Sequence, residues 1–122
     1  MKAEELYKIT KALMFEKASS KDYDNYYLDN INVILADTFN LNNVLREFKG
    51  LDPLINIPTV TKKDDEITYE PELCSRVLPN GLASRFFIDD DLSKFNIFTT
   101  YYENAKIETM RFIPSEVVDV YA

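Results

Sequence analysis

A chain of 122 residues fits a single domain, and its formal net charge of −7 disfavours general binding to nucleic-acid phosphates, which needs lysine and arginine. The chain has no histidine and only two glycines, so histidine-based catalysis, imidazole metal sites, P-loops and dinucleotide-binding loops are excluded. Its hydrophobic fraction of 46% beside 29% charged residues predicts a globular fold, and its one cysteine has no partner for an intramolecular disulfide.

The first predicted helix covers residues 2–18. Leu6, Ile9 and Leu13 recur at helical spacing in this stretch, so they are expected to share one apolar face. The polar cluster at 19–22 then breaks the pattern with residues that favour turns and helix N-caps. A second helix is therefore expected to begin near Asp22.

The longest apolar stripe of the chain lies between Asp22 and Phe48. It steps alternately by four and three residues and predicts one long helix or two coaxial ones. Asn40, Asn42 and Asn43 are poor helix formers and mark where a break would fall. The stripe suits a core face inside a bundle better than a coiled-coil seam, because it lasts barely three heptads and contains a threonine. It consists of Tyr27, Ile31, Ile34, Thr38, Leu41, Leu45 and Phe48.

The segment 49–70 differs from the helices around it. Gly50 suits a helix C-terminal cap, and Pro53 and Pro58 prevent a helix in the residues after it. Residues 59–61 and 66–69 are compatible with a short β-hairpin. A long connection of this kind inside a compact domain is often functional, so we expect it to contact a neighbouring protein. The expected contact residues are Ile55, Ile57 and Val60.

The third helical region begins at Pro71, a residue favoured in the first turn of a helix. Pro79 lies inside the same run, so the helix must kink there or begin afresh after Leu78. Residues 80–88 are expected to be helical in either case. Gly81 is small enough to allow another backbone to approach closely.

An acidic elbow, Asp89 to Asp91, joins this region to a last helix expected over residues 92–110. Asp91 is the predicted N-cap, because a carboxylate there accepts hydrogen bonds from free backbone amides. Two apolar stripes flank the elbow at helical spacing and predict packing in the core. The expected core residues from these stripes are Leu82, Phe86, Phe95, Phe98 and Tyr102, which join Ile31, Ile34 and Leu45.

The C-terminal tail, residues 111–122, is apolar and rich in β-branched side chains, and Pro114 prevents the preceding helix from continuing. A tail of this kind is expected either to dock on its own domain or to be captured by another chain. Captured strands bind by adding main-chain hydrogen bonds to an exposed edge. The expected contact residues of the tail are Phe112, Val118, Val120 and Tyr121.

No catalytic residue, metal ligand or cofactor site is predicted. The three aspartates of the elbow are oxygen ligands of the kind that Mg²⁺ or Ca²⁺ takes, but their spacing matches no calcium loop, so a turn with an N-cap is the preferred interpretation. Cys74 lacks a histidine to activate it and is expected to be a small buried residue. The eight tyrosines are not surrounded by basic residues, which favours core and interface packing over stacking on single-stranded nucleic acid.

These patterns predict a mainly α fold. A four-helix bundle-like domain over residues 1–110 would carry the inserted segment 49–70, as a long Pro-containing loop or small β-hairpin, and an extended C-terminal tail over residues 111–122. The order of the parts resembles the small helical head-to-tail adaptor (connector) proteins of tailed bacteriophages. The resemblance covers most of the chain and is carried by the runs INVILADTFNLNNVLRE, LPNGLASRFFIDDD and FNIFTTYYENA, and by the ending from Asp119 to Tyr121.

The resemblance implies a structural protein of the virion neck, made in the host cytoplasm, and no enzyme. Its partners would be other copies of itself in a ring, usually dodecameric, the portal protein, and stopper or tail proteins. DNA would pass as cargo without sequence-specific binding, and no membrane would be involved. The alternative is a small acidic helical regulatory or inhibitor protein that binds a basic protein partner by charge and a tyrosine-rich face. A carboxylate metal enzyme such as a nuclease is a third interpretation.

Overall fold

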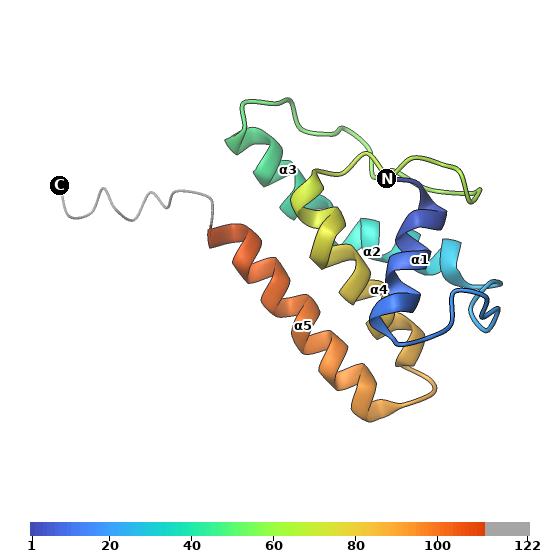
Figure 1. Cartoon of the computed structure of the whole chain (residues 1–122). Coiled ribbons are helices and arrows are strands. Elements are labelled where there is room, and N and C mark those ends of the chain that lie inside the picture. The colour runs from blue at the N-terminus through green and yellow to red at the C-terminus, as the bar shows by residue number, and fades with distance from the viewer. Residues whose placement is uncertain (112–122) are drawn as a thin grey trace.

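The computed structural model describes residues 1–111, which form a mainly α-helical, bundle-like fold and confirm the predicted fold class (Figure 1). In this part of the chain every regular element is helical. The π-helical turn η1 runs directly into α4, so that these two elements form one continuous helical segment. The elements are α1 (Ala3–Leu13), α2 (Tyr27–Asp37), α3 (Phe39–Phe48), η1 (Leu73–Val77), α4 (Leu78–Phe87) and α5 (Leu92–Arg111).

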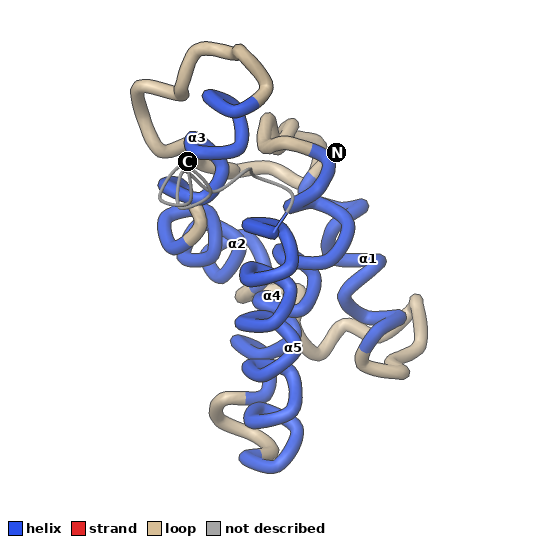
Figure 2. The backbone as a smooth tube through the Cα atoms, turned by 90° about the vertical axis from the view of Figure 1, so that its left-hand side faces the viewer, coloured by secondary structure: helices blue, strands red, loops and turns tan. Residues whose placement is uncertain are grey.

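Helix α4 is the centre of the fold, because α1, α2 and α5 all pack against it (Figures 1 and 2). Its sequence is apolar or small on nearly every side, as expected of a helix surrounded by others. Gly81 is the point of closest approach. A Cβ atom there would lie 2.7 Å from the Tyr102 ring and 3.2 Å from Ile34 Cδ1. Gly81 therefore makes room for the Tyr102 side chain of α5, whereas the sequence had predicted the close approach of another backbone.

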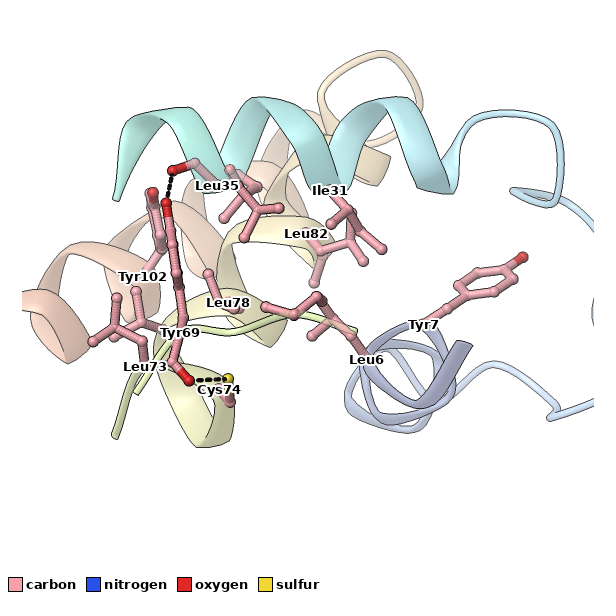
Figure 3. Packing of buried hydrophobic residues seen from close by; sticks show 14 of the residues in the cluster. Leu6, Tyr7, Ile31, Leu35, Tyr69, Leu73, Cys74, Leu78, Leu82 and Tyr102 are labelled. Atoms are coloured by element: carbon pink, nitrogen blue, oxygen red, sulfur yellow. Dashed lines mark hydrogen bonds between the residues drawn. The ribbon is translucent and has the colours of Figure 1, made fainter. Parts of the chain in front are cut away.

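Six of the eight predicted core residues are buried. Figure 3 shows Ile31, Leu82 and Tyr102 converging from α2, α4 and α5, with Tyr69 donating a hydrogen bond from its hydroxyl to the carbonyl of Leu35. Phe95 and Phe98 are half-buried and pack against the core, because α5 lies at the edge of the bundle. The predicted core residues that are fully buried are Ile31, Ile34, Leu45, Leu82, Phe86 and Tyr102.

The long stripe between Asp22 and Phe48 forms two helices, and the first begins at Tyr27. The break falls at Thr38, earlier than the asparagines that had marked it. The buried Thr38 hydroxyl donates to the carbonyl of Ile34 at 2.7 Å, a bond that bends helices by competing with the backbone ladder.

Pro79 is accommodated by the π-turn before it. The Leu78 N–H donates to the carbonyl of Leu73, one residue further back than in an α-helix, and α4 then starts with Pro79 in its first turn. Because proline has no N–H to donate, it cannot continue the α-helical ladder, and Pro79 stands where the wider π-turn gives way to α4.

The acidic elbow caps α5 as predicted. The Lys94 N–H donates to Asp91 Oδ1 at 3.1 Å, and the Phe95 N–H donates to the Asp91 carbonyl at 2.8 Å. This is the geometry of an N-cap, in which one side-chain oxygen satisfies a backbone amide that has no partner within the helix. The helix then continues to Arg111, one residue beyond the predicted end.

Of the two alternatives for segment 49–70, the structure has the long loop, and no hairpin forms between residues 59–61 and 66–69. Residues 63–67 instead pair with the N-terminus: the Ala3 N–H donates to the Asp65 carbonyl at 3.0 Å, and the Ile67 N–H to the Met1 carbonyl at 2.7 Å. These bonds satisfy backbone groups at the start of α1, which a hairpin would have left unpaired. The Asp65 carboxylate closes the turn by accepting the N–H groups of Thr61 and Lys62 at 2.7 and 2.9 Å, which lowers its pKa.

Candidate interaction surfaces

The loop that joins α3 to η1 is held in place by asparagine side chains. Asn43 accepts the Leu54 N–H at 2.8 Å and donates to the Leu54 carbonyl at 3.1 Å. Asn32 makes the same pair of bonds to Val60, at 2.7 and 2.9 Å. Each amide thus imitates a neighbouring β-strand for one residue. Asn43, predicted to weaken a helix, acts instead as a long-range anchor.

The two ends of the loop are fixed as well. At its start, Arg46 Nε donates to the Asp52 carbonyl at 2.7 Å. At its end, the Asn42 side chain accepts the Glu70 N–H at 2.8 Å, and Lys49 Nζ lies 3.1 Å from a Glu70 carboxylate oxygen. Lys49 also donates to Glu72 at 2.7 Å, and the bonds to Glu72 and Glu70 raise the pKa of the Lys49 ammonium. The backbone of the loop is therefore ordered by contacts within its own chain.

Between the Asn43 and Asn32 anchors the loop exposes an isoleucine. Ile55 is 92% exposed, Ile57 is also exposed, and both lie between Pro53 and Pro58. Within residues 1–111, no other part of the chain covers the Ile55 side chain, although its support is rigid. We call Leu51, Ile55 and Ile57, the exposed apolar residues of this loop, the loop surface.

Val60 does not belong to this surface and corrects a prediction. It is 1% exposed and belongs to the core of its own chain. The cause is the Asn32 anchor, which holds the Val60 main chain against α2 and leaves the side chain facing inward. Val60 is therefore unavailable to a partner.

A second apolar surface lies where the end of α1 meets α4 and the first half of α5. It is a groove of about 340 Å³, which is within the usual size range of binding pockets. Phe87 and Phe98 stack in it with ring centroids 5.6 Å apart, and Lys94 Nζ lies 5.3 Å from the Phe87 ring. We call this the α1–α5 groove. It is lined by Leu13, Met14, Phe15, Asn80, Phe87, Lys94, Ile97, Phe98 and Tyr101.

Phe15, at the lip of this groove, is unfavourable in the monomer in two ways. Its side chain is 96% exposed, and its φ of 60° makes it the one non-glycine residue with positive φ in residues 1–111. It ends α1 in a Schellman motif: its N–H donates to the Ala12 carbonyl at 3.1 Å, and the Glu16 N–H to the Lys11 carbonyl at 2.9 Å. The end of α3 has the same motif, built around Gly50 with φ 80° as predicted for that cap.

Phe15 and Gly50 occupy the same position in two Schellman motifs. Glycine adopts positive φ without strain, whereas a bulky side chain there raises the free energy of the folded state. An exposed aromatic ring at such a position contributes nothing to the monomer core. Residues of this kind concentrate at functional sites.

The acidic elbow lies beside an open pocket of about 340 Å³ that also contains tyrosines. The Tyr23 ring stacks on Phe86 at 4.3 Å, and its hydroxyl donates to Asp90 Oδ2 at 3.5 Å. Burial, and then the nearby Asp90 charge, raise the pKa of Tyr23 to about 12. In residues 1–111, the cysteine, aspartate and glutamate side chains form no group that could hold a metal ion. We call Asp22, Tyr23, Tyr26, Asp89 and Asp90 the acidic pocket; Arg85 also lines it, so three carboxylates and one guanidinium lie there.

The structure also places the other predicted features. Cys74 is buried, and burial raises the pKa of its thiol, so it is the small core residue that was expected. No helix within the described residues is long and apolar enough to cross a membrane. Four predicted contact residues lie outside the described part of the chain: Phe112, Val118, Val120 and Tyr121.

Sequence patterns selected Ile55 and Ile57 of the loop surface and missed the groove. The groove combines residues from α1, α4 and α5, and only folding brings these together. The predicted helix over residues 2–18 also hid Phe15: α1 ends at Leu13, and only this earlier end places Phe15 just after the last turn, where a glycine or asparagine is usual. No protein-family model, curated protein or solved structure matches this chain.

Proposed function

We propose that this protein is a structural assembly subunit: a head-to-tail adaptor of a tailed-phage neck, which forms a ring, docks on the portal and links the capsid to the tail. The observation that carries the proposal is the pair of apolar surfaces, each unfavourable in the isolated monomer. Both present large apolar side chains on rigid supports, as interface anchors do.

The placement of the two surfaces supports a ring. The loop after α3 lies at one end of the molecule, and the connection from α4 to α5, beside the groove, lies at the other (Figures 1 and 2). Contacts between two different surfaces are heterologous, and they produce closed rings when the rotation between neighbours closes. A single patch on a two-fold axis would have favoured a dimer.

The electrostatics suit a channel for DNA. A net charge of −7 on each subunit would give a ring a strongly negative character. Because like charges repel, the phosphate backbone would pass without tight contacts. Ile55 and Ile57, together with the C-terminal tail, remain our candidates for contact with other subunits, the portal, or stopper and tail proteins.

The test is ring formation with the portal. The purified protein is mixed with a candidate portal protein from the same genome, and the mixture is examined by size-exclusion chromatography with light scattering and by negative-stain microscopy. We expect a ring of density added to the portal. A protein that stays monomeric at all concentrations and leaves the portal unchanged would contradict the proposal.

The second candidate is a small acidic regulator that binds a basic protein, and the acidic pocket favours it. Its carboxylates and tyrosines are a chemistry suited to lysine and arginine side chains, through charge and cation–π contacts. This function predicts a 1:1 complex between the monomer and a basic partner, weakened by salt and by Asp90→Asn. Salt-independent binding would exclude it.

A further inference from the structure

We propose that the loop surface of one copy docks into the α1–α5 groove of the next copy, with Ile55 as the inserted side chain. This inference rests on the proposed function and specifies the contact that would build the ring. It commits the groove to a second copy of this chain, and assigns Phe15 the role of covering the inserted residue.

The loop has the properties of an inserting element. Ile55 is fully outside the core, and Asn43 and Asn32 fix the main chain on either side of it through two hydrogen bonds each. Two prolines further restrict the backbone between these anchors. Little conformational entropy therefore remains to be lost on docking, which is the main way in which rigid loops gain affinity.

The groove has the matching properties of a receiving site. Its walls are mainly apolar, from Leu13, Phe87, Ile97 and Phe98, and its volume can accommodate an isoleucine side chain together with a neighbour. Phe15 stands exposed at its lip in a strained backbone conformation. A docked apolar residue would remove both the ring of Phe15 and the groove walls from water. The exposed ring of Phe15 would then contribute apolar burial to the contact.

Position and charge favour a second copy over the loop of the same chain. The groove uses the first half of α5, whereas the second half of α5 contacts Asp37, at the end of α2, through Lys106. The loop follows α3 at that far end of the molecule, away from the start of α5 (Figure 2), and it is the start of α5 that lines the groove. Asp52, on the exposed start of the loop, would meet Lys94 at the rim of the groove, and these charges are complementary.

The experiment detects the contact between copies even if it is weak. A nitroxide label is attached to Asn56→Cys, next to the retained Ile55, while the buried Cys74 stays unlabelled. The labelled protein is mixed with wild-type protein carrying isotope-labelled methyl groups, at about 1 mM, where even a millimolar contact is populated. We expect the methyl signals of Leu13, Met14 and Ile97 to broaden, because only the other copy carries the label.

Two variants on one helix supply the matched control. Ile97 and Ile107 both lie on α5 and are 48% and 54% exposed, but only Ile97 lines the groove. Ile97→Asp should abolish the broadening and weaken association roughly a hundredfold or more, since it places an unpaired charge against the inserted isoleucine. Ile107→Asp should leave both unchanged. The reciprocal mixture of Ile55→Asp with Ile97→Asp should form a dimer that cannot grow, because each variant keeps one intact surface.

The outcomes separate this inference from the proposed function. Broadening at the loop of the second copy, broadening at Ile107 alone, or none at about 1 mM would overturn the inserted-loop contact. If Ile97→Asp still forms rings on the portal, the proposed function stands and the contact is wrong. If the wild-type protein neither broadens nor binds a portal, both fail.

Discussion

Replacing Phe15 by glycine should stabilise the monomer and abolish its assembly. A non-glycine residue at positive φ raises the folded-state free energy by roughly 1–2 kcal/mol, and glycine removes this cost. Glycine also raises the entropy of the unfolded chain, which offsets about 0.5–1 kcal/mol of the gain. The net gain should be about 0.5–1 kcal/mol. No burial is lost in exchange, because the Phe15 side chain is 96% exposed.

Thermal unfolding followed by circular dichroism measures the first effect. For 122 residues, an unfolding entropy of roughly 2.1 cal/mol/K per residue converts this gain into a rise of about 2–4 °C in Tm. Light scattering with the portal measures the second effect, for which we expect no ring. Stability and assembly would thus change in opposite directions from one substitution.

Two further variants separate the backbone from the side chain. Phe15→Ala keeps the positive φ and removes the ring, so it should abolish assembly without raising Tm. Gly50→Ala introduces a Cβ that meets nothing within 4 Å. Its expected loss of about 1 kcal/mol in the free energy of unfolding therefore measures the backbone cost of positive φ without a steric clash. A Phe15→Gly protein that melts below wild type, or that still forms rings, would refute the reasoning.

The remaining predictions concern the core, the loop and pH. Gly81→Ala places a Cβ 2.7 Å from the Tyr102 ring and should destabilise the fold by about 1–3 kcal/mol in urea titrations, whereas an unchanged midpoint would mean that the ring moves freely. Phe86→Ala should cost about 3–5 kcal/mol through a core cavity in the same assay. Asn43→Ala should leave the helical signal intact and weaken assembly, since it releases only the Leu54 anchor; assembly at wild-type strength would show that loop order is irrelevant. The pKa of the Asp65 carboxyl is lowered below its ordinary value of 3.8, so its contribution to stability is complete above that pH and is lost as the pH falls further. Asp65→Asn should therefore flatten the loss of stability below about pH 4 in acid titrations, and an equally steep loss would count against this assignment.

The sequence alone determined the helices, most of the core and the caps. The apolar repeat located the cores of α2, α3, α4 and α5, because a period of 3.6 residues arises from local backbone geometry. Asp91 and Gly50 were identified as caps for the same reason: their partners lie within a few residues along the chain.

Only the tertiary structure decided the fate of the loop and the existence of the groove. Asn32 and Asn43 bind loop residues 28 and 11 positions away, and such pairings leave no periodic trace in the sequence. The Asn32 pairing turned Val60 inward while Ile55 stayed outside, although both had been expected at an interface. The groove unites three helices around Phe15. Of its apolar residues, Leu13 and Phe98 belong to stripes that predict core packing, whereas Phe15, Ile97 and Tyr101 lie off those stripes, so no periodic pattern brings them together.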